Sequence, residues 1–154
     1  MNAIAFYRVA NWLFLHNVPF LPPIITKIIF LIYNSYIPYS ASIGDRSVFA
    51  YGGIGVVIHA NAKIGCGCVL GQGITIGAIE GYASSRANLC PTVGNNCYIG
   101  AGARLLGNIT IGNNCQIGAG SVIINDVPNG SIVVGVPGRI VGITDSDFTA
   151  IITS

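Results

Sequence analysis

A six-residue period runs through most of this 154-residue chain. Within each of three runs, a large aliphatic or aromatic residue recurs at every sixth position, and glycine directly follows most of these residues. A small residue follows four positions later in most units. Such regularity indicates a solenoid of stacked repeats rather than an ordinary globular core. The large residues are Ile37, Ile43, Phe49, Ile58, Ile64, Leu70, Ile76, Val93, Ile99, Leu105, Ile111, Ile117 and Ile123.

The period predicts short strands joined by tight corners. Side chains alternate between the two faces of a strand, so a six-residue unit directs its large and small residues inward only by turning between units. Glycine beside the large residue suits a corner with left-handed or cramped backbone angles. Asn95, Asn96, Asn113 and Asn114 also suit such turns, because asparagine tolerates left-handed angles. Three units then form one triangular coil, and coils stack as parallel strands about 4.8 Å apart.

Two insertions interrupt the period. The step from Phe49 to Ile58 contains three extra residues, and the step from Ile76 to Val93 contains eleven. The longer insertion, around 78–90, is rich in small and polar residues, which predicts an external loop of the kind that carries function in repeat proteins.

The segments on either side of the repeats have a different character. We expect a helical segment over 1–36, a β-helical domain over 37–142 that leaves the coil register after Val127, and a tail over 143–154. Asn2 can cap the first helix, three prolines (Pro19, Pro22 and Pro23) break it, and a second helix is expected from about Ile24 to Tyr33. The predicted apolar face of the first helix consists of Ala5, Val9, Trp12 and Leu13.

The apolar N-terminal segment is not expected to be a signal peptide or a membrane span. Arg8 lies within it, and no small-residue cleavage site follows. Pro19, Pro22, Pro23 and Lys27 interrupt the apolar stretch that a span would need. Two alternatives stay open: a helix packed on the protein or on a neighbouring subunit, and a helix in peripheral contact with a membrane surface.

Composition narrows the function classes. Hydrophobic residues make up 52% of the chain and charged residues only 8%, so part of the surface is expected to be buried in an oligomer. The net charge is +2 and no basic run exists, which argues against nucleic-acid binding. The cysteines match no zinc pattern and are predicted to be buried thiols in a reducing, cytoplasmic setting. They are Cys66, Cys68, Cys90, Cys97 and Cys115.

The hexapeptide units, the eleven-residue insertion and the closing segment Gly135-Val136-Pro137-Gly138-Arg139 resemble the hexapeptide-repeat acyltransferases. The nearest branch is the serine acetyltransferases and their relatives that acetylate sugars, and the resemblance covers roughly residues 37–142. It implies a mainly β fold, a left-handed parallel β-helix, which is an exception to the usual right-handed crossover. It also implies a homotrimer that binds acetyl-CoA between adjacent subunits and transfers the acetyl group to a small-molecule hydroxyl.

Three departures separate the chain from the serine acetyltransferases. Those enzymes carry an Asp-His pair where this chain has Ala50-Tyr51, and a second histidine where it has Cys90 before Pro91. They also carry a long helical N-terminal domain, of which this sequence contains little. Gln72, in contrast, lies in a segment common in the branch. The acceptor therefore stays open between L-serine and a sugar hydroxyl of a surface polysaccharide.

Acyl transfer to a hydroxyl needs a general base, and histidine is the usual choice because its pKa lies near neutrality. His59 is the candidate, since it lies one coil below the root of the long insertion and just after the shorter one. Tyr51 and Gln72 are candidates for orienting or stabilising groups. His16 lies outside the repeats and is not expected to act. The alternative is that His59 is merely an exposed residue of a structural unit.

The same spacing suggests a donor site. Ala101 and Gly102 lie 18 residues before Ala119 and Gly120, so the two pairs stack on one corner. Small side chains there leave a channel with accessible backbone groups, which suits the amide-bearing pantetheine arm of coenzyme A. Arg139 is a candidate for the phosphates. The alternative is that glycine and alanine merely fit the turn.

Two other function classes remain. One is a non-catalytic structural or ligand-binding β-helix that has lost its base. The other is carbonic-anhydrase-like metal chemistry, which needs three histidines at subunit interfaces. The chain has only two histidines, so no metal is expected.

Overall fold

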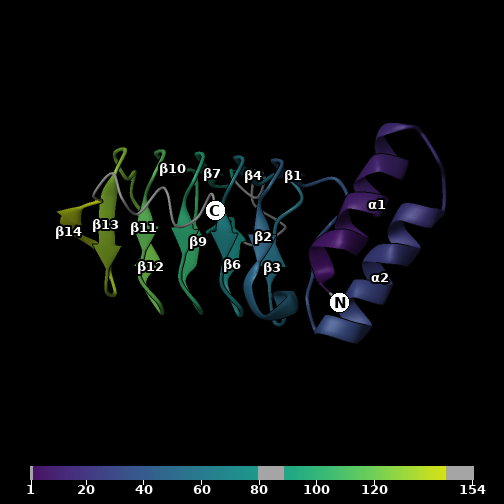
Figure 1. Ribbon diagram of the computed structural model, residues 1–154, viewed down its shortest axis with the longest axis horizontal. Coiled ribbons are helices and arrows are strands. Elements are labelled where there is room, and N and C mark those ends of the chain that lie inside the picture. Colours follow the sequence, from purple (N-terminus) through teal and green to yellow (C-terminus); the bar gives the residue numbers. More distant parts are fainter. Residues whose placement is uncertain (1, 80–88, 145–154) are drawn as a thin grey trace.

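The computed structural model describes residues 2–79 and 89–144. The described chain begins with two helices, α1 (Ala3–Leu15) and α2 (Leu21–Tyr33), and continues as a rod of stacked short strands (Figure 1). A short 3₁₀ turn, η1 (Ala50–Gly53), interrupts the strands. The strands are β1 (Ser42–Ile43), β2 (Val48–Phe49), β3 (Val57–Ile58), β4 (Lys63–Ile64), β5 (Val69–Leu70), β6 (Thr75–Gly77), β7 (Thr92–Val93), β8 (Tyr98–Ile99), β9 (Arg104–Leu106), β10 (Thr110–Ile111), β11 (Gln116–Ile117), β12 (Val122–Ile123), β13 (Ser131–Val134) and β14 (Arg139–Ile143).

The strands form three walls, and each coil contributes one strand to each wall. The first sheet has the order β1-β4-β7-β10, the second β2-β5-β8-β11-β13-β14, and the third β3-β6-β9-β12. All pairings are parallel except that of β13 with β14. The prediction of a mainly β, parallel coil with an N-terminal helical segment is therefore confirmed.

The walls keep the predicted register. Ile58 pairs with Ile76, and Ile99 with Ile117, at a spacing of 18 residues. Pairs that span an insertion are further apart in sequence by the predicted three or eleven residues, as in Phe49 with Leu70 and Ile76 with Leu105. The insertions therefore leave the core unchanged. Most of the predicted loop, residues 80–88, and the tail 145–154 lie outside the described residues.

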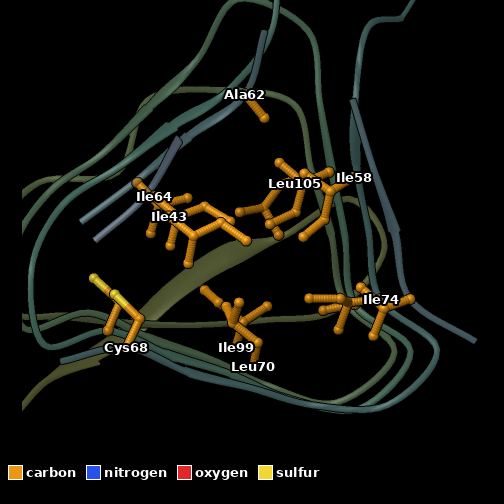
Figure 2. Close-up of a cluster of buried hydrophobic side chains, with 14 of the residues drawn as sticks. Ile43, Ile58, Ala62, Ile64, Cys68, Leu70, Ile74, Ile99 and Leu105 are labelled. Carbon is orange, nitrogen blue, oxygen red and sulfur yellow. The ribbon is translucent and has the colours of Figure 1, made fainter. Parts of the chain in front are cut away.

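The inside of the coil is filled as the period predicts. All thirteen large residues named above are buried, and so are the small residues four positions later. Figure 2 shows stacked side chains pointing inward from each wall, with Ile43 and Ile64 on one, Leu70 and Ile99 on another, and Ile58 on the third. Each such side chain contributes about 1.5–3 kcal/mol through burial, which supplies a core without helix packing.

Glycine after the large residue is needed mainly because neighbouring coils approach closely. A Cβ on Gly100 would lie 2.5 Å from the backbone nitrogen of Ala119 in the next coil. Left-handed angles occur elsewhere in the corner, including Asn96 (φ 54°) and Asn114 (φ 56°), as predicted.

The other two predicted turn asparagines have a different role. The side-chain oxygen of Asn113 accepts a hydrogen bond from the backbone N–H of Asn95 at 2.7 Å. The Asn95 oxygen accepts from the N–H of Cys66 at 2.8 Å, and Asn129 extends the series by accepting from Asn113. This asparagine ladder links successive coils at one corner.

The first coil is capped by polar side chains of α1 and of its N-cap residue, Asn2. The Tyr7 hydroxyl donates a hydrogen bond to the carbonyl of Ala41 at 2.5 Å. The side-chain amide of Asn11 donates to Tyr39 at 2.7 Å, and that of Asn2 to Phe49 at 2.8 Å. These contacts satisfy carbonyls that have no coil beneath them, so the helices close the open edge of the solenoid.

The opposite end is closed by the chain itself. From Val127 onward the spacing is 16 residues, as in the pairings of Ile111 with Val127 and of Ile117 with Val133. The predicted departure from the coil register is thus correct, yet the wall continues through β13. Strand β14 then turns back antiparallel and covers that edge.

The helical segment differs from the prediction in two respects. Helix α2 begins at Leu21 rather than near Ile24, because proline is tolerated in a first turn whose N–H groups lack helical partners. The predicted apolar face of α1 is not the buried one: Val9 and Trp12 are 54% and 57% exposed, whereas Ala3, Tyr7 and Ala10 are buried. Small residues and a hydroxyl fit the coil edge better than bulky side chains. Neither helix is long and apolar enough to cross a membrane.

Close stacking makes Gly100 sensitive to a single added methyl group. We expect Gly100→Ala to destabilise the protein by about 1–3 kcal/mol through overpacking, which lowers the melting temperature by about 2–4 °C per kcal/mol. Gly77→Ala is the matched control, because no atom of the residues that the structure describes lies within 4 Å of its Cβ position. Thermal unfolding by circular dichroism measures both, and equal melting temperatures would contradict the packing argument.

Candidate active site

The candidate residues lie at two corners of the triangular coil. The corner between the second and third sheets, here the Gln72 corner, is formed by residues that follow β2, β5, β8 and β11. The corner between the third and first sheets, here the His59 corner, follows β3, β6, β9 and β12. The Gln72 corner contains Tyr51, Gln72, Ala101, Gly102, Ala119 and Gly120.

The Gln72 corner is a straight column of stacked turns. The N–H of Gly102 donates to the carbonyl of Gln72 at 2.8 Å, and that of Gly120 to Ala101 at 2.8 Å. The predicted stacking of the Ala-Gly pairs is therefore confirmed. Ala119 and Gly120 are exposed, so this column presents backbone and methyl groups to solvent. The side-chain oxygen of Gln72 is buried and has no hydrogen-bond partner among the described residues.

Tyr51 lies in η1, at the first turn of this column. Its side chain is 78% exposed, and its backbone is left-handed (φ 52°). Strand β3 separates Tyr51 from His59, so the three-residue insertion lies at the preceding corner and not beside the histidine. Within one chain, Tyr51 and Gln72 are therefore not brought to His59.

His59 directly follows β3, as predicted, one coil below the root of the long insertion. Its backbone N–H donates to the carbonyl of Ile76 at 2.8 Å, and its side chain is half-buried. The ring nitrogen Nδ1 accepts a hydrogen bond from the backbone N–H of Asn61 at 3.2 Å. Because a backbone N–H only donates, Nδ1 carries a lone pair and the neutral ring holds its proton on Nε2.

The sulfur of Cys90 lies 3.0 Å from the same Nδ1 atom. Cys90 ends the long insertion, retains 9% exposure, and is a free thiol. Burial raises the pKa of this thiol above its usual value, so at neutral pH the S–H group donates to Nδ1. The long insertion thus returns to the coil beside His59.

Sequence reasoning missed this pair. The prediction that the cysteines are buried thiols is confirmed for four of them, and Cys66 is partly exposed. The sequence alone, however, predicted no partner for Cys90. The available signal was that Cys90 occupies a position where the resembling enzymes carry a histidine.

Arg139 begins β14, at the end of the rod away from the helices (Figure 1). It is exposed and lines a shallow pocket with Asn125, Asp126 and Gly138. Its guanidinium group is therefore accessible to an anion at this end of the coil. Among residues 2–79 and 89–144, no three histidine, cysteine or acidic side chains gather into a metal-binding group.

Comparison with known proteins shows which proteins this coil is similar to. A family model described as bacterial transferase hexapeptide (six repeats) matches residues 90–125. The serine acetyltransferase of Synechococcus elongatus is 40% identical over 140 residues, or 91% of this chain, and that of Bacillus subtilis is 38% identical over 92%. This chain is a hexapeptide-repeat protein related to the serine acetyltransferases. The residues matched by the repeat family model begin at Cys90 and include β7 to β12.

Solved structures of serine acetyltransferases have the same fold as this hexapeptide-repeat chain. The Vibrio cholerae enzyme is 33% identical, covers 99% of the chain and has a TM-score of 0.85. The Brucella abortus enzyme in complex with coenzyme A is 31% identical, covers 93% of the chain and has a TM-score of 0.84. The chain spans only 57% of the Vibrio cholerae structure and 56% of the Brucella abortus structure, and 56% and 63% of the two curated relatives above.

The hydrogen bonds around His59 predict its tautomer. We expect the neutral imidazole to carry its proton on Nε2, because Nδ1 accepts from both Asn61 and Cys90. Nitrogen-15 NMR above the histidine pKa distinguishes a protonated from an unprotonated ring nitrogen. His16, whose Nδ1 lies 2.8 Å from the carbonyl of Trp12 and so donates, is an internal control with the opposite tautomer. A protonated Nδ1 on neutral His59 would contradict the assignment.

Proposed function

We propose that this chain is an acetyl-CoA-dependent O-acetyltransferase with His59 as general base. The observation that carries the proposal is the half-buried imidazole whose lone pair lies at the root of the long insertion. Its relation to serine acetyltransferases over 91% of the chain supports the reaction class. A base held in this way removes the proton of an attacking hydroxyl, which is the step that acyl transfer to an alcohol needs.

The donor is proposed to lie along the Gln72 corner. Ala101, Gly102, Ala119 and Gly120 offer backbone groups without bulky side chains, as an extended pantetheine arm requires. The coenzyme A complex of a structure with a TM-score of 0.84 supports this donor. We assign the phosphates to Arg139, because its exposed guanidinium lies at the end of the rod beyond Ala119.

Two classes of acceptor are proposed. L-serine is the first, since the relatives are named for it. A sugar hydroxyl of a surface polysaccharide is the second, because Ala50-Tyr51 and Cys90 replace groups that the serine enzymes carry. Tyr51 and Gln72 are proposed to orient the acceptor, since both are at the Gln72 corner and the buried side-chain oxygen of Gln72 has no hydrogen-bond partner among the described residues.

We further propose a homotrimer of left-handed coils. The Gln72 corner and the His59 corner of one chain lie on different edges of the coil, and a neighbouring subunit would bring one against the other. The exposed apolar faces of α1 and α2, with Trp12, Phe30 and Leu31 among them, offer a contact between subunits or with a membrane surface. We propose that the chain divides into a helical segment over 1–36, an acyltransferase domain over 37–142 and a tail over 143–154. A cytoplasmic location is also proposed, because the five cysteines are free thiols.

His59→Ala is expected to lower acetyl transfer by about 10²–10⁴-fold, the usual effect of losing a positioned base. Coenzyme A affinity and melting temperature should barely change, because the ring lies outside the aliphatic core. The control is His16→Ala, an exposed ring stacked on Trp12, which should retain activity. Release of coenzyme A is measured against a panel of L-serine and sugars. If His59→Ala keeps its activity, His59 is not the base. If the wild-type protein transfers acetyl to none of the acceptors, the alternative of a non-catalytic coil is favoured.

Ala119→Leu is expected to weaken coenzyme A binding at least about tenfold, or 1.4 kcal/mol, because the side chain would fill the proposed channel. Cys66→Leu is the control, since it adds similar bulk at the third corner of the coil. Isothermal titration calorimetry gives both affinities. Unchanged binding in Ala119→Leu would place the channel elsewhere.

A further inference from the structure

If the acetyl group passes directly from coenzyme A to the acceptor hydroxyl, with His59 as base, the thiol of Cys90 has no role. Yet this thiol contacts the base. The sulfur is 3.0 Å from His59 Nδ1, within hydrogen-bond reach. Cys90 is held in place by the first sheet, where the carbonyl of the next residue, Pro91, accepts from the N–H of Lys63 at 3.2 Å. The pair is thus fixed by two adjacent coils rather than by a chance surface contact.

The tautomer of His59 limits which group it can deprotonate. Asn61 fixes Nδ1 as the acceptor, so Nε2 carries a proton and is not basic in the neutral ring. The basic nitrogen is therefore the atom that already accepts from the Cys90 thiol. A hydroxyl acceptor can use this lone pair only after the thiol proton is gone.

The surroundings of Cys90 fit a nucleophile that is activated on demand. Burial raises the pKa of the thiol, so a base is needed to form the reactive thiolate. The base lies beside it, and a third group, the N–H of Asn61, orients that base. Cys90 also keeps 9% exposure as a residue and adjoins the exposed Leu89, so it is not sealed in the core.

We propose that Cys90 is a catalytic nucleophile and that acyl transfer passes through a thioester on this cysteine. The inference rests on the proposed acetyltransferase function and changes its mechanism from direct transfer to two half-reactions. Covalent catalysis of this kind divides one difficult step into two easier ones.

The atoms balance in both half-reactions. In the first, His59 Nδ1 takes the Cys90 proton and gives up its bond to Asn61, the thiolate attacks the acetyl carbonyl carbon, and the bond from that carbon to the coenzyme A sulfur breaks. The departing coenzyme A thiolate receives the proton from Nδ1. In the second, the acetylated sulfur no longer donates to Nδ1, so this atom removes the proton of the acceptor hydroxyl. The alkoxide attacks the thioester, and the released Cys90 thiolate regains that proton from His59.

The decisive experiment exposes the whole protein to acetyl-CoA without an acceptor. Acid quenching followed by intact-mass and peptide mass spectrometry should find one acetyl group on Cys90, which neutral hydroxylamine removes. Labelled coenzyme A should also exchange into acetyl-CoA without an acceptor. In His59→Ala the acylation rate should fall by at least about 10²-fold, and addition of an acceptor should discharge the wild-type adduct.

Two variants separate catalysis from structure. Cys90→Ser keeps a hydrogen-bond donor beside His59 but should form no thioester and lose at least about 10²-fold in turnover. Cys66→Ala removes a partly exposed thiol away from the pair and should retain the Cys90 adduct, which excludes random acetylation. Melting curves check that both variants fold.

The outcomes distinguish this inference from the function on which it rests. The thioester is overturned if the wild-type protein turns over without an acetyl adduct on Cys90 and without coenzyme A exchange, and if Cys90→Ser stays active. The protein would then transfer the acetyl group directly, and Cys90 would only position His59. A wild-type protein that releases no coenzyme A with any acceptor and shows no exchange would overturn both proposals.

Discussion

The close stacking of one coil on the next is the constraint on which this structure depends. Each wall is a ladder of parallel hydrogen bonds between strands only two to four residues long, except at β14, so no strand is stable without its neighbours above and below. The stack requires glycine wherever a Cβ would meet the next backbone, as at Gly100. It also requires large residues that fill the inside at every level (Figure 2).

A stack of this kind has two open edges, and the chain closes both. Tyr7 and Asn11 of α1, with the N-cap residue Asn2, supply donors to carbonyls of the first coil. Strand β14 folds back over the last one. Many of the bulky residues of the N-terminal segment, such as Trp12, Phe30 and Leu31, face outward, where the proposed trimer or a membrane would cover them.

The same stacking decides where chemistry can occur. Residues 18 apart share a corner, so functional groups collect in columns along the rod, and Tyr51 and Gln72 lie in a different column from His59. Insertions are tolerated at the corners because the walls keep their register on either side of them. The long insertion ends at Cys90 and brings its thiol to His59. In the proposed mechanism Cys90 is a sulfur nucleophile at the position where, by the sequence resemblance, the serine acetyltransferases carry a histidine.

The sequence alone determined the walls, the core and the stacking of the Ala-Gly pairs, because a six-residue period leaves one way to bury Ile58, Leu105 and their equivalents. It also indicated His59, through its place below the insertion. The start of α2 and the buried face of α1 were mispredicted, since docking onto a coil edge, not helix periodicity, selects them. Only the tertiary structure showed that Tyr51 and Gln72 lie at a different corner from His59. The contact of the Cys90 thiol with His59, 31 residues away in sequence, also appears only in the tertiary structure. The same holds for the tautomer that the backbone N–H of Asn61 imposes on the ring, because periodicity does not encode the distances between these atoms.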